Sequence, residues 1–498
     1  MAATKNKYKT GEIMTARTGA ELLKGMKSER EVWMGDQRVE DVTEHPQLSA
    51  TAQVLADIYD LQHESAEDCL TADPETGEMI NITHVIPRSK EDLQNRHRCI
   101  QRVAERTVGV LGRTPCYKNV TVAGFAGDYV EWAKNGNEAG AERLVEYQKH
   151  LRRNDLLLTH ALLNATVDKS QHPNGGDNAQ VCLQKVEDTE QGILVRGARV
   201  LATLSPFADE LIVYSPTPVS EDGQRFALSF AIPINTPGLK FFCRDSYTTV
   251  NNIFDQPFSA RFDEQDAFVV FDNVEVPRER IFIDGNVSVH NQVTRRTWAA
   301  NIFQQTFIRA QTKLEFAWGI ATAMTEAVGD SSPRTAQLLG EIWSYASLTR
   351  AALVAAEEQA MDYGNGLVLP NRELLQPLQA MMPIWMPRVG EIIRQVGSHH
   401  LLTTPTLSML ENSELRPVLN KYLRGAGEVD VELRTRLCRL AWDFAGSALA
   451  SRGDLYERFY LGSSPRAFEV SQRIANKDRA RALVARFLSE PVPRKLEL

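Results

Sequence analysis

Gly112-Arg113-Thr114-Pro115-Cys116-Tyr117 marks a helix start around which the rest of the chain is arranged. Thr114 suits the N-cap, and Pro115 suits the first helical position because its missing N–H would be unpaired there. Apolar residues recur at helical spacing from Tyr117 to Trp132. The pattern places Arg113 just outside a helix N-terminus, where a guanidinium, a phenol and free backbone N–H groups favour a bound anion.

The composition is that of a globular protein with more than one domain. The chain has 498 residues, 43% of them hydrophobic and 24% charged, so two or three domains are expected. Its net charge of -8 argues against a nucleic-acid partner, which usually requires a basic excess. No apolar run reaches the length of a membrane span, and the Lys-rich residues 1–10 contain no apolar core, so we expect a cytoplasmic protein. The six cysteines form no CxxC pair, which argues against a metal site or a disulfide framework.

Three regions with different patterns follow one another. The predicted helices of residues 1–156 start at 18 and 89 or span 49–63, 112–134 and 139–151. Residues 157–284 contain short runs rich in β-formers, separated by turn residues: 181–186, 192–203, 210–214, 226–232, 239–243 and 267–276. Residues 285–498 contain four long helical stretches typical of a bundle: 298–328, 333–363, 372–396 and 433–449. Because strands and helices do not alternate, a doubly wound sheet is excluded and the middle region is expected to be a barrel or sandwich.

Common cofactor and catalytic motifs are absent from the sequence. There is no GxGxxG after a strand, no P-loop, no GxSxG and no HExxH, so any cofactor is held by other means. His160 lies in an apolar segment, 156–163, at the boundary between the helical and β-rich regions. Burial lowers the pKa of an imidazole, so a buried His160 is a neutral base near pH 7. From the pattern alone, a core histidine, a solvated Arg113 and a packing Tyr117 remain the more ordinary interpretation.

Six sequence motifs change that balance. They are GRTPxY at 112–117, THAL at 159–162, GARVLAT at 197–203, SARFDE at 259–264, VFDNVxVP at 270–277, and WD at 442–443 with DLYE at 454–457. Together they resemble the oxygenase component of 4-hydroxyphenylacetate 3-monooxygenases, in family order from about residue 17. The resemblance implies an α+β, acyl-CoA-dehydrogenase-like fold with a helical domain (1–156), a β-barrel (157–284) and a four-helix bundle with a tail (285–498). It also implies a homotetramer.

The resemblance implies a two-component, FAD-dependent monooxygenase. A separate NAD(P)H-dependent reductase supplies reduced FAD, which diffuses to the oxygenase and forms a C4a-hydroperoxide with O₂. The distal oxygen is then added ortho to the hydroxyl of a small phenol, giving a catechol. The phenol is either free or tethered to a carrier protein, and the sequence leaves its identity open.

The same resemblance assigns roles to individual residues. Arg113 favours the phenolate, His160 takes the phenol proton as general base, and Tyr117 hydrogen-bonds the oxygen. The cofactor contacts are assigned to His160, Ala161, Leu162, Thr166, Val167, Asp168, Lys169 and Thr203, and to a C-terminal loop of Gly462, Ser463 and Ser464. Ser215 and Pro216 begin a loop, 215–223, that closes over the substrate in the family. A plain solvated hairpin is the competing interpretation of that loop.

Other enzyme families and a non-catalytic scaffold are the alternatives to this assignment. Related halophenol and nitrophenol monooxygenases carry an Asn-His pair early in the first bundle helix, whereas Asn301-Ile302-Phe303-Gln304-Gln305 contains no His. His290 is nearby in sequence, but we place it in a solvent-facing loop. A 4-hydroxybutyryl-CoA dehydratase is rejected because the cysteines of its iron–sulfur cluster are missing. An acyl-CoA-dehydrogenase-like flavoenzyme and a non-catalytic helical scaffold are the interpretations from other classes.

Overall fold

Helices dominate the first part of the chain, as predicted. The computed structural model describes residues 14–250 and 252–489, so the Lys-rich residues 1–10 lie outside it. The helices are α1 (Gly19–Met26), α2 (Ser49–Glu64), α3 (Ala66–Cys69), α4 (Lys90–Arg106), α5 (Pro115–Gly127), α6 (Tyr129–Trp132) and α7 (Glu138–Asn154). Thr18 and Glu21 form a capping box at the start of α1, and the Ser89 hydroxyl accepts a hydrogen bond from a backbone N–H of α4.

Four short strands in the same part of the chain were not predicted. They are β1 (Glu31–Met34), β2 (Gln37–Val39), β3 (Leu70–Ala72) and β4 (Met79–Asn81). β1 runs parallel to β11 (Leu239–Cys243), with Val32 opposite Phe241. The N-terminal region therefore contributes two strands to the sheet of the middle region.

The middle of the chain forms two sheets around a shared core. One sheet has the order β2-β1-β11-β12-β8-β6, with β7 also paired to β8, and the other has the order β13-β10-β9-β5. Phe230 of β10 meets Phe271 of β12 edge to face, with ring centroids 6.1 Å apart. The remaining strands are β5 (Leu158–Ala161), β6 (Leu163–Asn164), β7 (Gln184–Asp188), β8 (Gly192–Thr203), β9 (Glu210–Val213), β10 (Leu228–Pro233), β12 (Asp266–Pro277) and β13 (Ile281–Asp284).

Most predicted strands are confirmed, and one is partly wrong. The runs 192–203 and 239–243 match β8 and β11. The run 181–186 does not begin as a strand, because a helical turn, α8 (Asn178–Val181), occupies its first position and β7 starts at Gln184. β5 was not predicted as a strand, yet it pairs parallel to β9 and carries His160 opposite Ile212.

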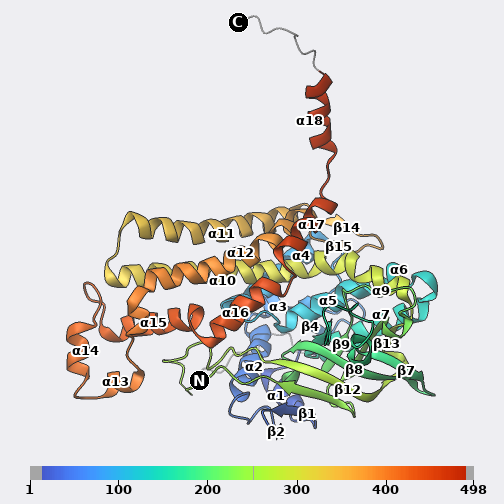
Figure 1. Ribbon diagram of the computed structural model, residues 1–498, viewed down its shortest axis with the longest axis horizontal. Coiled ribbons are helices and arrows are strands. Elements are labelled where there is room, and N and C mark those ends of the chain that lie inside the picture. Colours follow the sequence, from blue (N-terminus) through green and yellow to red (C-terminus); the bar gives the residue numbers. More distant parts are fainter. Residues whose placement is uncertain (1–13, 251, 490–498) are drawn as a thin grey trace, which may run out of the picture.

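The C-terminal part is a bundle of long helices lying side by side above the sheets (Figure 1). α10 (Ala299–Val328), α11 (Pro333–Glu358) and α12 (Arg372–Gly397) are its longest members. The predicted helix 433–449 is instead two helices, α15 (Val431–Ala445) and α16 (Ala448–Phe459), because Gly446 ends the first and the Ser447 hydroxyl caps the second. The chain ends in α17 (Ser464–Ile474) and α18 (Asp478–Ser489), and α18 stands away from the rest (Figure 1).

Shorter elements complete the bundle region. They are α9 (Val287–Val293), a π-helical turn (Thr294–Trp298), β14 (Met361–Asp362), β15 (Val368–Leu369), α13 (Leu407–Glu411) and α14 (Arg416–Tyr422). The predicted helix 333–363 ends earlier, at Glu358, because the residues near its predicted end form the strand β14. No helix within the described residues combines the length and hydrophobicity needed to cross a bilayer.

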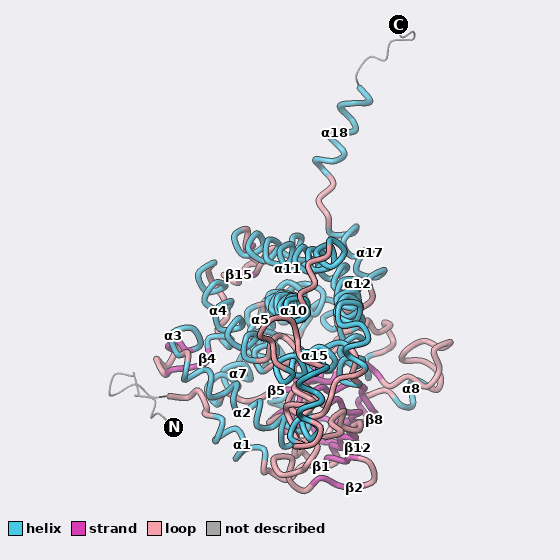
Figure 2. The backbone as a smooth tube through the Cα atoms, turned by 90° about the vertical axis from the view of Figure 1, so that its left-hand side faces the viewer, coloured by secondary structure: helices cyan, strands magenta, loops and turns pink. Residues whose placement is uncertain are grey.

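α5 is the helix on which the bundle and the sheets meet. Figure 2 looks along the long helices and shows α5 next to α10, with the strands on the other side. Every residue of α5 is buried, although Lys118, Asn119 and Thr121 are polar. At Gly124 any Cβ would lie 2.2 Å from the Asn301 amide nitrogen, so only glycine allows α10 to approach this closely. A helix buried on all sides holds its first residues rigidly between the two halves of the molecule.

Candidate active site

Arg113 and Tyr117 meet at the start of α5, as the sequence predicts. Arg113 is 7% exposed and Tyr117 is fully buried, and the guanidinium carbon lies 4.2 Å from the centroid of the Tyr117 ring. Thr114 occupies the N-cap position, but its hydroxyl makes no capping bond and instead accepts a hydrogen bond from the Gln305 amide at 3.2 Å. The predicted N-cap position is therefore confirmed, although the hydroxyl bonds to α10 and not to the first turn of α5.

His160 joins this pair from the sheet side. Its side chain is buried on β5, and its ring lies edge to face with Tyr117, with centroids 5.9 Å apart. Its Nδ1 lies 3.1 Å from the Tyr214 hydroxyl oxygen. The other ring nitrogen, Nε2, is not used in that hydrogen bond. The three residues singled out from the sequence, Arg113, Tyr117 and His160, thus come together in space.

The charges around this trio are unbalanced. Burial, followed by the neighbouring basic side chains of Lys118 and Arg113, lowers the pKa of His160 well below its usual value, so the imidazole is neutral. Burial raises the pKa of Tyr117, and Arg113 only partly offsets this, so the phenol keeps its proton. Burial disfavours the Arg113 charge, but the oxygen of Tyr117 and those of neighbouring tyrosines outweigh it and raise the Arg113 pKa.

Several buried polar atoms at this point have no hydrogen-bond partner. They are Arg113 Nε and Nη1, the Tyr117 hydroxyl, Lys118 Nζ and the Tyr456 hydroxyl. The guanidinium carbon of Arg113 lies 5.5 Å from the Tyr456 ring and 5.2 Å from the Tyr460 ring. A buried polar group without a partner costs about 1–3 kcal/mol. A concentration of such donors in one place indicates a ligand with acceptor atoms.

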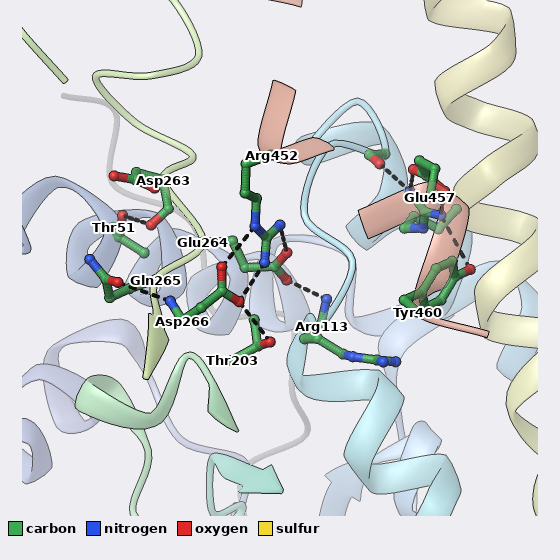
Figure 3. Close-up of polar contacts among 12 residues, drawn as sticks. Thr51, Arg113, Thr203, Asp263, Glu264, Gln265, Asp266, Arg452, Glu457 and Tyr460 are labelled. Atoms are coloured by element: carbon green, nitrogen blue, oxygen red, sulfur yellow. Dashed lines mark hydrogen bonds and ion pairs between the residues drawn. The ribbon is translucent and has the colours of Figure 1, made fainter. Parts of the chain in front are cut away.

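The backbone of Arg113 is engaged separately from its side chain. Its N–H donates to Glu264, whose other oxygen accepts from Arg452 at 2.7 Å. Arg452 also binds both oxygens of Asp266, at 2.7 and 2.9 Å. In Figure 3 the Arg113 N–H faces Glu264, while the guanidinium extends to the other side, toward Tyr460. An anion was predicted at this helix N-terminus, and the Arg113 N–H is occupied by the carboxylate of Glu264. Of the two donor groups of Arg113, the guanidinium therefore remains for a ligand.

Thr203 lies at the edge of the same network. Its hydroxyl donates to Asp266 at 2.9 Å, and its carbonyl oxygen accepts from the Thr159 hydroxyl at 2.7 Å (Figure 3). The end of β8 is therefore tied both to Arg452 and to the strand that carries His160.

The other residues assigned to the cofactor follow His160 along the chain. The Leu162 carbonyl oxygen accepts from Arg199 at 2.7 Å. Thr166 and Val167 line a cavity of about 440 Å³ over the outer face of β8 and β12. The side-chain oxygen of Asn178 accepts hydrogen bonds from the N–H groups of Val167 and Asp168, at 2.9 and 3.0 Å. These bonds hold the loop that contains Val167 and Asp168 in place. Ala161 is buried, whereas Lys169 is exposed to solvent.

The C-terminal loop approaches the trio from the bundle. Gly462 has a φ of +91° and lies two residues after Tyr460, which contacts Arg113. The Gln379 amide donates to the Leu461 carbonyl oxygen at 2.6 Å and ties the turn to α12. Ser463 and Ser464 then begin α17.

The loop that starts at Ser215 is anchored to α9. The Ser215 hydroxyl accepts from the Thr217 N–H at 3.1 Å. The Asn291 side chain binds both the N–H and the carbonyl oxygen of Val219, each at 2.9 Å. Pro216 lies between these anchors, one residue after Ser215. The loop joins the antiparallel strands β9 and β10, and it is solvated only in part: Ser215 and Val219 are buried, whereas Pro218 and residues 220–222 are exposed.

His290 is not in a solvent-facing loop, so that prediction is wrong. It lies in α9, is 3% exposed, and its Nε2 is 3.3 Å from the Thr217 carbonyl oxygen. Burial lowers the pKa of His290 to about 4, with Arg199 adding to the effect. This helix could not be predicted from the sequence, because α9 spans only Val287–Val293 and is too short for a helical pattern to be recognised.

The segment at 301–305 has a structural role in this chain. Arg96 donates to the side chains of Asn301 and Gln304, both at 2.7 Å, and so joins α4 to α10. Gln305 donates to Thr114. These side chains are therefore occupied in holding α4 and α5 in place.

Two cavities among the described residues do not include the trio. One of about 60 Å³ is bordered by Lys313, Arg452 and Glu457, and neither it nor the 440 Å³ cavity is lined by Arg113, Tyr117 or His160. Among the described residues, no group of three or more His, Cys, Asp and Glu side chains is arranged to hold a metal ion.

Comparisons with known proteins agree with the geometry. Residues 18–283 match the family described as "4-hydroxyphenylacetate 3-hydroxylase N terminal", and residues 289–489 match "4-hydroxyphenylacetate 3-hydroxylase C terminal". The 4-hydroxyphenylacetate 3-monooxygenase oxygenase component of Thermus thermophilus is 35% identical over 481 residues, which cover 95% of this chain and 98% of that protein. The oxygenase component of the 4-nitrophenol 2-monooxygenase of a Rhodococcus species is 32% identical, covering 89% of this chain and 86% of the relative.

A solved structure extends the likeness to the fold. The crystal structure of a 4-hydroxyphenylacetate 3-monooxygenase oxygenase component complexed with FAD and 4-hydroxyphenylacetate has a TM-score of 0.90 at 34% identity. It covers 95% of this chain and 98% of that one. The expected α+β fold, with helices first, a β-rich middle and a C-terminal helical bundle, is therefore confirmed. On this evidence the chain belongs to the 4-hydroxyphenylacetate 3-hydroxylase family.

Proposed function

We propose that this protein is the oxygenase component of a two-component monooxygenase. It uses reduced FAD and O₂ to hydroxylate a phenol ortho to its hydroxyl group and gives a catechol. The observation that carries the proposal is the buried guanidinium of Arg113, whose Nε and Nη1 lack acceptors, beside Tyr117 and His160. Membership of the family supplies the reaction class.

The trio is suited to holding an ionised phenol. A free phenol has a pKa of about 10, and its ring reacts more readily with an electrophilic oxygen once the proton has left. Arg113 favours the phenolate charge, Tyr117 keeps its proton and donates a hydrogen bond, and His160 presents Nε2. Because these groups are buried, their effect on the charge is larger than it would be in water.

Reduced FAD, when bound, supplies the electrophilic oxygen together with O₂. We assign its contacts to His160, Ala161, Leu162, Thr166, Val167, Asp168, Lys169, Thr203, Gly462, Ser463 and Ser464. Two observations support a fit: the cavity lined by Thr166 and Val167, and the unpartnered donors at the trio. Burial of the trio also keeps water away from the reacting oxygen.

Binding of the phenol requires local movement. Tyr456 and Tyr460 of the α16 end contact the Arg113 guanidinium, so we expect the turn at 460–463 to shift when ligands enter. We assign the opposite wall to Ser215 and Pro216, because their loop begins directly after Tyr214, the partner of His160.

The partners follow from the reaction class. A separate NAD(P)H:flavin reductase supplies the reduced FAD, by diffusion or by contact. The substrate is a small phenol, free or carrier-tethered, and the assembly is a homotetramer. A nitrophenol monooxygenase is the second candidate, favoured by the Rhodococcus relative. The engagement of Asn301, Gln304 and Gln305 in helix packing gives it less support.

Turnover with a surrogate reductase tests the proposal. The purified protein would receive reduced FAD, O₂ and a panel of para-substituted phenols, with catechol and hydrogen peroxide measured for each. We expect catechol from at least one phenol. Arg113→Ala and His160→Ala should still consume reduced FAD but release peroxide instead. Absence of catechol across the panel would contradict the function, and unchanged catechol yield in both variants would contradict the assigned roles.

A further inference from the structure

Lys118 is a buried lysine that neither the sequence motifs nor the trio explains. It follows Tyr117 on α5 and is 1% exposed. Its Nζ has no hydrogen-bond partner and lies 4.1 Å from the centroid of the Tyr117 ring. Lysine is almost never fully buried unless it is paired, so an unpaired one at a candidate site points to a ligand.

The charged groups facing Lys118 are few. Arg113 is a cation that shares the Tyr117 ring with it, at 4.2 Å. Glu264 is the neighbouring carboxylate, but it is already engaged by the Arg113 N–H and by Arg452. The Tyr117 phenol and the His160 imidazole are the other titratable groups beside it. Burial, followed by repulsion from Arg113, lowers the pKa of Lys118 well below its usual value. Because Nζ is buried without a paired carboxylate and lies beside the Arg113 guanidinium, this environment favours the neutral amine, which has a free lone pair.

We propose that Lys118 is a further catalytic residue of this site: its amine accepts the proton of the bound phenol, and the resulting ammonium pairs with the phenolate. The inference rests on the proposed function and deepens it. The phenol O–H bond breaks, an N–H bond forms at Nζ, and the electron pair of the broken bond stays on the phenolate oxygen. No proton leaves the site and no co-reactant is required.

The arrangement favours this transfer over one to His160. Arg113 lowers the pKa of both bases, but an alkyl amine is intrinsically more basic than an imidazole by roughly four pKa units, so the amine is the better acceptor in this shared environment. Protonation of Lys118 by the phenol creates an anion at the same moment, so the new ammonium is no longer an unpaired buried charge. In this scheme the Tyr214 hydroxyl donates to Nδ1 of His160, and Nε2–H donates to the phenolate oxygen.

A coloured phenol bound without flavin provides the test. The probe is 4-nitrophenol, whose ionised form has its own absorption band, and it would be added in weak buffer below its pKa in water. Unmodified protein should bind it as the phenolate without releasing a proton. Lys118→Met keeps the side-chain length but removes the lone pair, and it should bind the probe as the neutral phenol. Lys313→Met is the matched control, since Lys313 is also largely buried but is paired with Glu457 at 2.9 Å, and it should behave as unmodified protein.

Each other outcome is decisive. Phenolate in Lys118→Met without proton release would identify another internal acceptor and overturn the inference while leaving the proposed function in place. Binding of the probe as the neutral phenol by the unmodified protein would overturn the inference, whereas the proposed function fails only if no phenol of the panel gives a catechol. A second measurement checks the empty site: the thermal midpoint of Lys118→Met should rise, because an unpaired buried amine is removed. A lower midpoint would show that Nζ has a partner without ligand and would contradict the proposal.

Discussion

Two clusters of buried cations lie near the start of α5, and they differ in whether an anion is present. In the first, Arg309 binds both oxygens of Glu457, at 2.7 and 2.9 Å, and Arg452 binds Glu264 and Asp266. In the second, no carboxylate of the described residues pairs with the Arg113 guanidinium, and Lys118 Nζ is unpartnered. A fold that pairs its charges in one place and leaves them unpaired in the next reserves the second place for a ligand.

The largest expected effect breaks the paired cluster. Glu457→Ala leaves Arg309 buried without an anion, and breaking a buried pair in this way costs about 3–5 kcal/mol. Denaturant unfolding measures the change. Arg113→Met should lower the unfolding free energy by less, since no ion pair is lost and only contacts with the tyrosine rings are removed. An equal loss in both variants would remove the distinction between the clusters.

The next effect concerns turnover at the unpaired cluster. Arg113→Met removes the cation that favours the phenolate, and loss of one such donor typically lowers kcat by about 100- to 1000-fold. Hydroxylation, followed by catechol formation in single turnovers, should fall by that factor while reduced FAD is still oxidised. The double variant Arg113→Met/Lys118→Met sharpens the comparison: if the two cations act on one anion, their effects are not additive.

The two clusters should also respond to pH in different ranges. Glu457 has a pKa of about 2 in the fold, against 4.5 in the unfolded chain. The stability that this carboxylate contributes, about 3 kcal/mol for such an interval, is present above pH 4.5 and is lost as the pH falls toward 2. Lys118 has a lowered pKa, so between that value and 10.5 the unfolded chain binds the extra proton and stability rises with pH. Lys118→Met should abolish the rise of the unfolding free energy at alkaline pH and leave its decrease at acid pH unchanged. If the alkaline rise is retained in this variant, another group causes it.

The smallest effect lies outside both clusters, at the loop 215–223, which we propose to cover the substrate. Asn291→Ala removes two hydrogen bonds to Val219, each worth about 0.5–1.5 kcal/mol. We expect a higher KM for the phenol with a nearly unchanged ratio of catechol to flavin consumed. A change in that ratio instead would mean that the loop acts on the chemistry at Arg113.

Local patterns in the sequence account for much of the fold. Helical spacing indicated α10, α12 and α7, and alternation with turn residues indicated β8 and β11. The strands β1 and β2 were missed because they have four and three residues, and because β1 is stabilised by pairing with β11, far along the chain, while β2 pairs with β1. α15 and α16 were read as one helix because their apolar spacing continues across the break at Gly446.

The candidate site was predictable only in part. The motifs brought Arg113, Tyr117 and His160 together, and the structure places them in contact. Lys118 lies next to Tyr117 in the sequence, yet a lysine among polar residues of a helix is read as solvated. Its burial comes from α10 and the sheet on either side of α5, which no local pattern reveals.

The ultraviolet difference spectrum of a bound para-substituted phenol at neutral pH tests the central claim most directly. The claim is that the unpaired cations at the start of α5 hold the phenol in its ionised form. The unmodified protein is predicted to show the phenolate band at a pH where the free phenol is neutral, and Arg113→Met is predicted to lose it. A neutral phenol spectrum in the unmodified protein would contradict the account.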